Sequence, residues 1–129
     1  MLEDVARARA RESALLRQHG HTCVAIYLAG YVIECRLKTL LDRQGKKFPR
    51  SGSMGHDLIG LWDKAGLRHR DLTGHKLEFI QFWKTALRYQ VTLPGEVDVD
   101  NLMQGGRELA GMVSIRIRYA RPVRGRKRP

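Results

Sequence analysis

The sequence predicts an all-α protein: a five-helix up-and-down bundle followed by a disordered basic tail. Apolar residues recur at steps of three and four along several segments, which is the spacing of one buried helix face. Proline, glycine and aspartate gather between these segments and mark their ends. No stretch alternates polar and apolar residues for long enough to form a sheet.

The first two helices are predicted over residues 2–18 and 22–43. The first has a sparse apolar stripe. The second is apolar around most of its circumference, as a buried helix should be, and Thr22 is its expected cap. Gly30 inside it costs about 1 kcal/mol relative to alanine, so we expect another helix to cross closely there. Four arginines of the first helix are expected to face water: Arg7, Arg9, Arg11 and Arg17.

Three further helices follow, and each begins beside a turn or a capping residue. Asp57 can accept hydrogen bonds from the free amides of a first turn, and its charge suits the positive end of the helix dipole. Gly105 and Gly106 weaken the last helix from within and favour a kink. The three helices are predicted over residues 57–65, over residues 75–90 and, from a cap at Asp98 or Asp100, to Tyr119.

The chain of 129 residues is expected to form one domain, residues 1–120, with residues 121–129 as a flexible basic tail. No apolar stretch approaches the ~20 residues needed to cross a bilayer, and the N-terminus has no apolar signal core. Cys23 and Cys35 share one predicted helix and lie about 18 Å apart along its axis, too far for a disulfide. We therefore expect buried thiols, no membrane association and a cytoplasmic location.

The net charge of +11 arises from 24 basic residues against 13 acidic ones, and arginine outnumbers lysine. Such a field attracts polyanions, and the planar arginine fork can donate two hydrogen bonds to one phosphate. A genome rich in arginine codons would give the same excess, with solubility as its only consequence. The basic run at the end of the chain contains no acidic residue, and it suits nonspecific RNA or DNA contact, an acidic protein partner, or solubility alone. The predicted nucleic-acid contacts are Arg121, Arg124, Arg126, Lys127 and Arg128.

Several segments between Leu15 and Tyr89 occur in an order and spacing that resemble the HEPN superfamily, small helical proteins associated with nucleotides and RNA. The resemblance implies an HEPN-like bundle that forms a homodimer. It also implies a partner of one of three kinds: RNA or nucleotide, a minimal nucleotidyltransferase, or an antitoxin. The segments are Ala29 to Cys35 with Leu37-Lys38, Gly55 to Leu58, Ala65 to Leu67, and Trp83 with Leu87 to Tyr89.

Catalytic HEPN proteins are metal-independent ribonucleases that use an arginine followed, after four to six residues, by a histidine. Arg70 and His75 fit this spacing. Histidine can move a proton near neutral pH, and arginine can stabilise the charge that develops on a phosphate. Arg68 with His75 and Arg50 with His56 satisfy the same spacing, as an arginine-rich chain allows.

Arg88 offers a different alignment, because the motif arginine of many HEPN proteins stands on the fourth helix. No histidine follows Arg88 at the required spacing, so this alignment leaves the chain without a catalytic histidine. Glu34, on the buried helix, needs a cation, because an unpaired buried carboxylate is costly. Lys38 and Arg88 are the two candidates, and we interpret Glu34 and Arg88 as a structural ion pair.

Together these observations favour a non-catalytic accessory or binding protein that engages RNA, nucleotide or a nucleotidyltransferase partner. The alternative is a metal-independent ribonuclease, of toxin or defence type, that uses Arg70 and His75. A third reading is a dimer scaffold without a ligand. Neither a metal nor a cofactor is expected, because the histidines and cysteines show no zinc spacing and no glycine-rich phosphate loop precedes a strand.

Overall fold

The structure is a computed structural model that describes residues 1–48, 57–83, 93, 95 and 97–120. Across these residues the chain is all-α, without a strand, and folds as an up-and-down helical bundle. The predicted fold class is confirmed, whereas residues 121–129, the predicted tail, lie outside the described residues. The described helices are α1 (Leu2–Gln18), α2 (Thr22–Arg43), α4 (Leu58–Lys64), the 3₁₀ helix η1 (His69–Asp71), α5 (Gly74–Phe82) and α6 (Val99–Tyr119).

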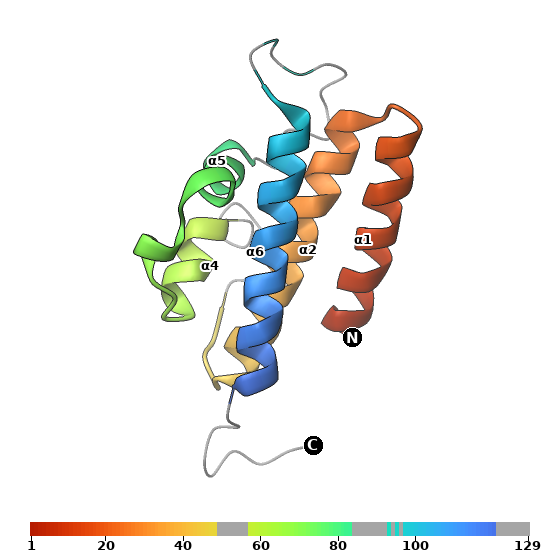
Figure 1. Cartoon of the computed structure of the whole chain (residues 1–129). Helices are drawn as coiled ribbons and strands as arrows, with labels where there is room; N and C mark the ends of the chain where they lie inside the picture. The colour runs from red at the N-terminus through yellow and green to blue at the C-terminus, as the bar shows by residue number, and fades with distance from the viewer. Residues whose placement is uncertain (49–56, 84–92, 94, 96, 121–129) are drawn as a thin grey trace.

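Helix α2 lies at the centre of the bundle (Figure 1). α1 packs along it in the opposite direction, whereas α6 packs along it in the same direction. α4 and α5 lie on the side of α6 and α2 that faces away from α1. Because neighbours surround α2, it is apolar around most of its circumference. Its fully buried side chains include Ala25, Ile26, Ile33, Leu37, Leu40 and Leu41.

Two of the predicted helix caps are present. The carboxylate of Asp57 accepts a hydrogen bond from the Gly60 amide at 3.1 Å, and that of Asp98 accepts one from the Asn101 amide at 3.0 Å. The capping prediction for Thr22 is wrong, because Thr22 is the first residue of α2 and no side chain caps this helix. The first turn of α2 is instead hydrogen-bonded to backbone atoms of the α1–α2 connection.

Helix α5 ends at Phe82, earlier than the predicted end at residue 90, because Trp83 adopts an extended conformation. The Trp83 indole N–H donates to the Tyr27 carbonyl at 3.0 Å, and its ring stacks on that of Tyr27 with centroids 6.0 Å apart. A Cβ atom at Gly30 would collide with this indole. The close neighbour expected at Gly30 is therefore a tryptophan side chain, and the remainder of the predicted fourth helix lies outside the described residues.

Helix α6 runs unbroken through Gly105 and Gly106. A Cβ at Gly105 would collide with the carbonyl of His75, and one at Gly106 would lie 3.0 Å from the Phe79 ring. The two glycines therefore let the first turns of α5 approach the backbone of α6. In the described part of the chain, no helix combines the length and the apolar character that a membrane span requires.

Candidate functional site

The predicted catalytic pair, Arg70 and His75, occupies two neighbouring segments. Arg70 is exposed in η1, and His75 lies in the first turn of α5, where its Nδ1 atom is 3.4 Å from Oε2 of Glu78. No hydrogen bond or ion pair joins Arg70 to His75. Around Arg70, Arg68 pairs with Asp71 at 3.6 Å and His69 pairs with Asp63. Arg70 and His75 are therefore both accessible to solvent, and no direct hydrogen bond joins them.

Glu34 meets a cation, as the sequence required. The Lys38 ammonium lies 2.8 Å from the Glu34 carboxylate, and the two residues are only 5% and 2% exposed. This is the first of the two candidate pairings, one helical turn along α2. Arg88, the second, lies outside the described residues, so the Glu34–Arg88 pair stays a prediction.

The face of α2 that carries Glu34 also carries a thiol and a phenol with raised pKa values. Burial raises the pKa of the Cys35 thiol to about 11, and the Glu34 carboxylate adds to the rise. Burial also raises the pKa of the Tyr31 phenol, with further contributions from Cys35 and Glu34. Both groups are therefore protonated near neutral pH, and a protonated thiol is not a nucleophile. Cys23 and Cys35 are both buried free thiols, as predicted.

A groove between α1 and α6, with α2 as its floor, is the feature that sequence reasoning missed. It contains two cavities of about 430 and 400 Å³, which share Arg36 and therefore adjoin. We call it the arginine groove. It is lined by Arg7, Arg17, Arg36, Arg43, Arg107 and Arg118.

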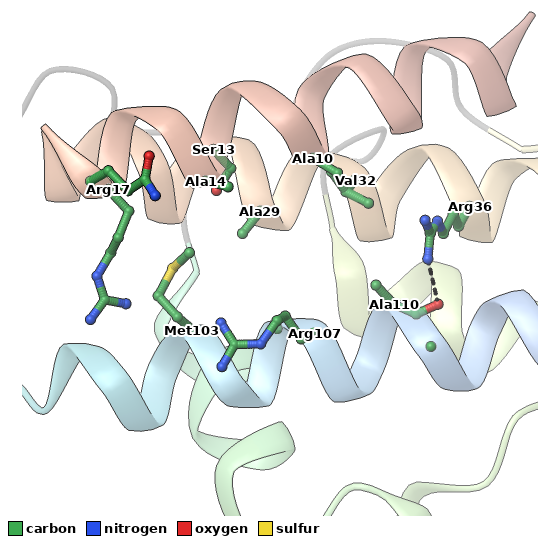
Figure 2. A pocket seen from close by; sticks show the side chains of 13 residues that line it. Ala10, Ser13, Ala14, Arg17, Ala29, Val32, Arg36, Met103, Arg107 and Ala110 are labelled. Carbon is green, nitrogen blue, oxygen red and sulfur yellow. Dashed lines mark hydrogen bonds between the residues drawn. The ribbon is translucent and has the colours of Figure 1, made fainter.

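Three helices contribute the charge of the groove. Figure 2 shows Arg17, Arg36 and Arg107 extending from α1, α2 and α6 around the first cavity. Arg17 pairs with Asp100 across the end of the groove. The guanidinium groups of Arg7 and Arg43 lie 2.6 Å from Asp4 and 3.4 Å from Glu3. Three arginines have no carboxylate partner among the described residues: Arg36, Arg107 and Arg118.

Arg36 is the half-buried centre of the groove, and its position is fixed. Its Nη1 donates to the Ala110 carbonyl at 3.0 Å (Figure 2). One heptad along, Arg43 donates to the Ile117 carbonyl at 3.2 Å, because α2 and α6 are parallel and keep the same register. Burial lowers the pKa of Arg36; Glu3 opposes the shift and Arg7 adds to it. The guanidinium remains charged at neutral pH, and Glu3, which lines the same part of the groove, favours that charge.

The sequence offered only a partial signal for this groove. The prediction that the arginines of α1 face water is accurate for Arg7 and Arg11, whereas the side chains of Arg9 and Arg17 are only 37% and 29% exposed. Arg36 and Arg43 stand seven residues apart, a spacing that places them on one side of α2. Their convergence with arginines of α1 and α6 depends on tertiary packing that local patterns do not contain.

No family model, curated protein or solved structure matches this chain. The resemblance to the HEPN superfamily therefore stays a prediction that rests on the residues quoted for it. Among the described residues, no group of three or more histidine, cysteine, aspartate or glutamate side chains could hold a metal ion.

Proposed function

We propose that this protein is a non-catalytic, HEPN-like RNA-binding module and that the arginine groove is its RNA-contact surface. The observation that carries the proposal is the convergence of Arg36, Arg107 and Arg118 on one groove without carboxylate partners among the described residues. Guanidinium groups bind phosphate oxygens by bidentate, charge-assisted hydrogen bonds. A polyanion in the groove would add phosphate oxygens beside Arg36, whose side chain forms no ion pair with a carboxylate among the described residues.

The overall charge supports the same assignment. A net charge of +11 attracts RNA from solution and raises the rate of encounter. The groove is the surface at which we expect the attracted RNA to bind. Contacts of this kind read the phosphate backbone and therefore depend steeply on salt. Protein partners such as a nucleotidyltransferase or an antitoxin would need an acidic surface to occupy the same groove.

The test is a pair of double variants with the same change in charge. Arg107→Glu with Arg118→Glu reverses two groove arginines of α6, whereas Arg11→Glu with Arg116→Glu reverses two exposed arginines outside the groove, one on α1 and one on α6. We expect the groove variant to bind a single-stranded RNA about tenfold or more weakly. The slope of log affinity against log salt concentration should become shallower by about two. Fluorescence anisotropy over a salt series measures both quantities. Equal losses of RNA affinity in the two variants would show that binding depends only on the net charge of the protein. No RNA binding by the wild type would refute the proposal.

The alternative, a metal-independent ribonuclease, is tested with the same RNA. It is supported by the access of Arg70 and His75 to solvent in adjacent segments. The binding proposal expects the RNA to remain intact in the absence of metal. Cleavage that disappears in His75→Ala would establish the ribonuclease instead, because loss of the proton-transfer group removes a contribution of about 10²–10⁴-fold to the rate.

A further inference from the structure

The arginine groove has two chemically different halves. The half toward the end of α1 is the larger cavity and has a mainly apolar surface, formed by small side chains of three helices. The half toward the start of α1 is charged. The first half is lined by small and apolar side chains that include Ala14, Ala29, Met103, Gly106, Ala110 and Gly111, with Arg17, Arg36 and Arg107 around them. The second is lined by Arg7, Arg36, Arg43, Arg118, Glu3 and Ser114. Arg36 belongs to both halves.

The apolar half has the size and surface of a small-molecule site. Its volume of about 430 Å³ lies in the range of natural ligand pockets, which are mostly apolar with a few polar groups that fix orientation. Small side chains leave its walls smooth: nothing lies within 4 Å of the position that a Cβ at Gly111 would take. Open space beside an apolar surface suits a flat ring, which gains contact energy on its faces.

The arrangement of the halves specifies what the ligand must carry. An apolar body in the first half lies next to the half-buried cation of Arg36, so the ligand needs an anionic group beside that body. A nucleotide has this form, because its base and its phosphate are joined through one sugar. An acidic helix is about 10–12 Å across with its side chains, and it fits less well into a cavity of about 430 Å³.

We infer that the groove takes one nucleotide unit of unpaired RNA, with the base in the apolar half and the phosphate on Arg36, flanked by Arg7 and Arg118. This inference rests on the proposed function and adds a preference for single strands. A base that is stacked and paired in a duplex cannot enter the cavity without unpairing. Base–protein contacts of this kind tolerate different sequences, because every base has a flat apolar face.

Filling the apolar half tests the inference directly. Gly111→Phe adds a ring at a residue that lines the cavity, and no atom lies close enough to its Cβ to force the backbone apart. We expect affinity for a short single-stranded oligoadenylate to fall about tenfold, because the added ring takes up space that the base would occupy. Affinity for inorganic polyphosphate of similar charge should change less than about twofold, since polyphosphate has no base.

Matched controls separate the cavity from the fold. Ile115→Phe adds an aromatic ring to the same helix at a residue that is 53% exposed and outside both cavities, and it should leave both affinities unchanged. Gly111→Ala adds only a methyl group and should retain most of the oligoadenylate affinity. Circular dichroism melts establish that each variant is folded.

Competition experiments distinguish the source of the nucleotide. AMP that displaces oligoadenylate from the wild type, but not from Gly111→Phe, identifies a free nucleotide as sufficient. Displacement by single-stranded RNA alone identifies the polymer as the ligand, and both results support the base site. Equal loss of oligoadenylate and polyphosphate affinity in Gly111→Phe, or no loss of either, would overturn it.

Two further results bear on the inference. Duplex RNA that binds as tightly as the single strand would overturn it, as would polyglutamate that competes with oligoadenylate and loses affinity in Gly111→Phe. In either case the charge-reversal variants still report independently on whether the groove arginines bind RNA at all. The base site can therefore fail while the proposed function stands.

Discussion

Individual glycines decide how closely parts of this molecule approach one another. Because Gly30 has no Cβ, the Trp83 indole can pack against its backbone, and the His75 backbone packs against Gly105 in the same way. Gly111 lies on the same helix as Gly105, but it faces the open groove instead of a packed neighbour. The same residue type therefore has opposite roles on the two faces of α6.

Alanine substitution should separate these roles. Gly111→Ala is expected to stabilise the protein by about 1 kcal/mol, because alanine is the better helix former and its Cβ meets open space. Gly105→Ala should destabilise it by about 1–3 kcal/mol, because its Cβ collides with a carbonyl that cannot move away without disturbing α5. Urea denaturation followed by circular dichroism measures both changes. Shifts of the two midpoints in the same direction would contradict this account of α6.

Whole helices were predictable where local signals mark their ends. α1 and α2 span the predicted residues, α4 is one residue shorter than predicted at each end, and α6 runs from the residue after Asp98 to the predicted end at Tyr119. Capping aspartates and turn glycines act within a few residues, so the sequence alone contains their effect. α5 was placed less well, because Trp83 leaves the helix to reach Tyr27, more than fifty residues away in the sequence. A contact of that separation has no local signature.

The start of α6 offers a test at the scale of one helix. The sequence left Asp98 and Asp100 open as caps, and the structure assigns the capping hydrogen bond to Asp98. Asp98→Ala should therefore cost about 1 kcal/mol of stability. Asp100→Ala should cost less, because Asp100 is 86% exposed and contributes through the helix dipole and a surface pair with Arg17. Equal losses in thermal or urea unfolding would show that the capping bond is not decisive.

At the scale of the whole molecule, the fold class could be predicted but the candidate site could not. Helical periodicity identified an all-α bundle, yet it does not tell which helices touch and which leave a space between them. The groove exists because α1 and α6 both pack on α2 and leave a space between them. The expected homodimer and the predicted contacts in residues 121–129 are also properties of the whole protein, and both stay predictions.

Deleting residues 121–129 tests how the charge is divided between the chain end and the groove. The deletion removes five basic residues without acidic ones. RNA affinity should fall at low salt and the salt slope should become shallower, because fewer counterions are released on binding. The ratio of oligoadenylate to polyphosphate affinity should stay the same, since the base site lies in the groove. Unchanged RNA affinity after the deletion would remove the nucleic-acid role from Arg121, Arg124, Arg126, Lys127 and Arg128.

The one-sided packing of α1 has a consequence for local unfolding. Among the described residues α1 packs mainly on α2, and the groove lies between α1 and α6, which the pair of Arg17 with Asp100 joins at one end. A helix held on one face can detach at a lower free-energy cost than the central helices, and its amides then exchange hydrogen with solvent sooner. A ligand that touches both walls would have to be released before α1 could detach. A ligand bound in the groove would therefore slow the hydrogen exchange of amides along the whole of α1, including turns that do not contact the ligand.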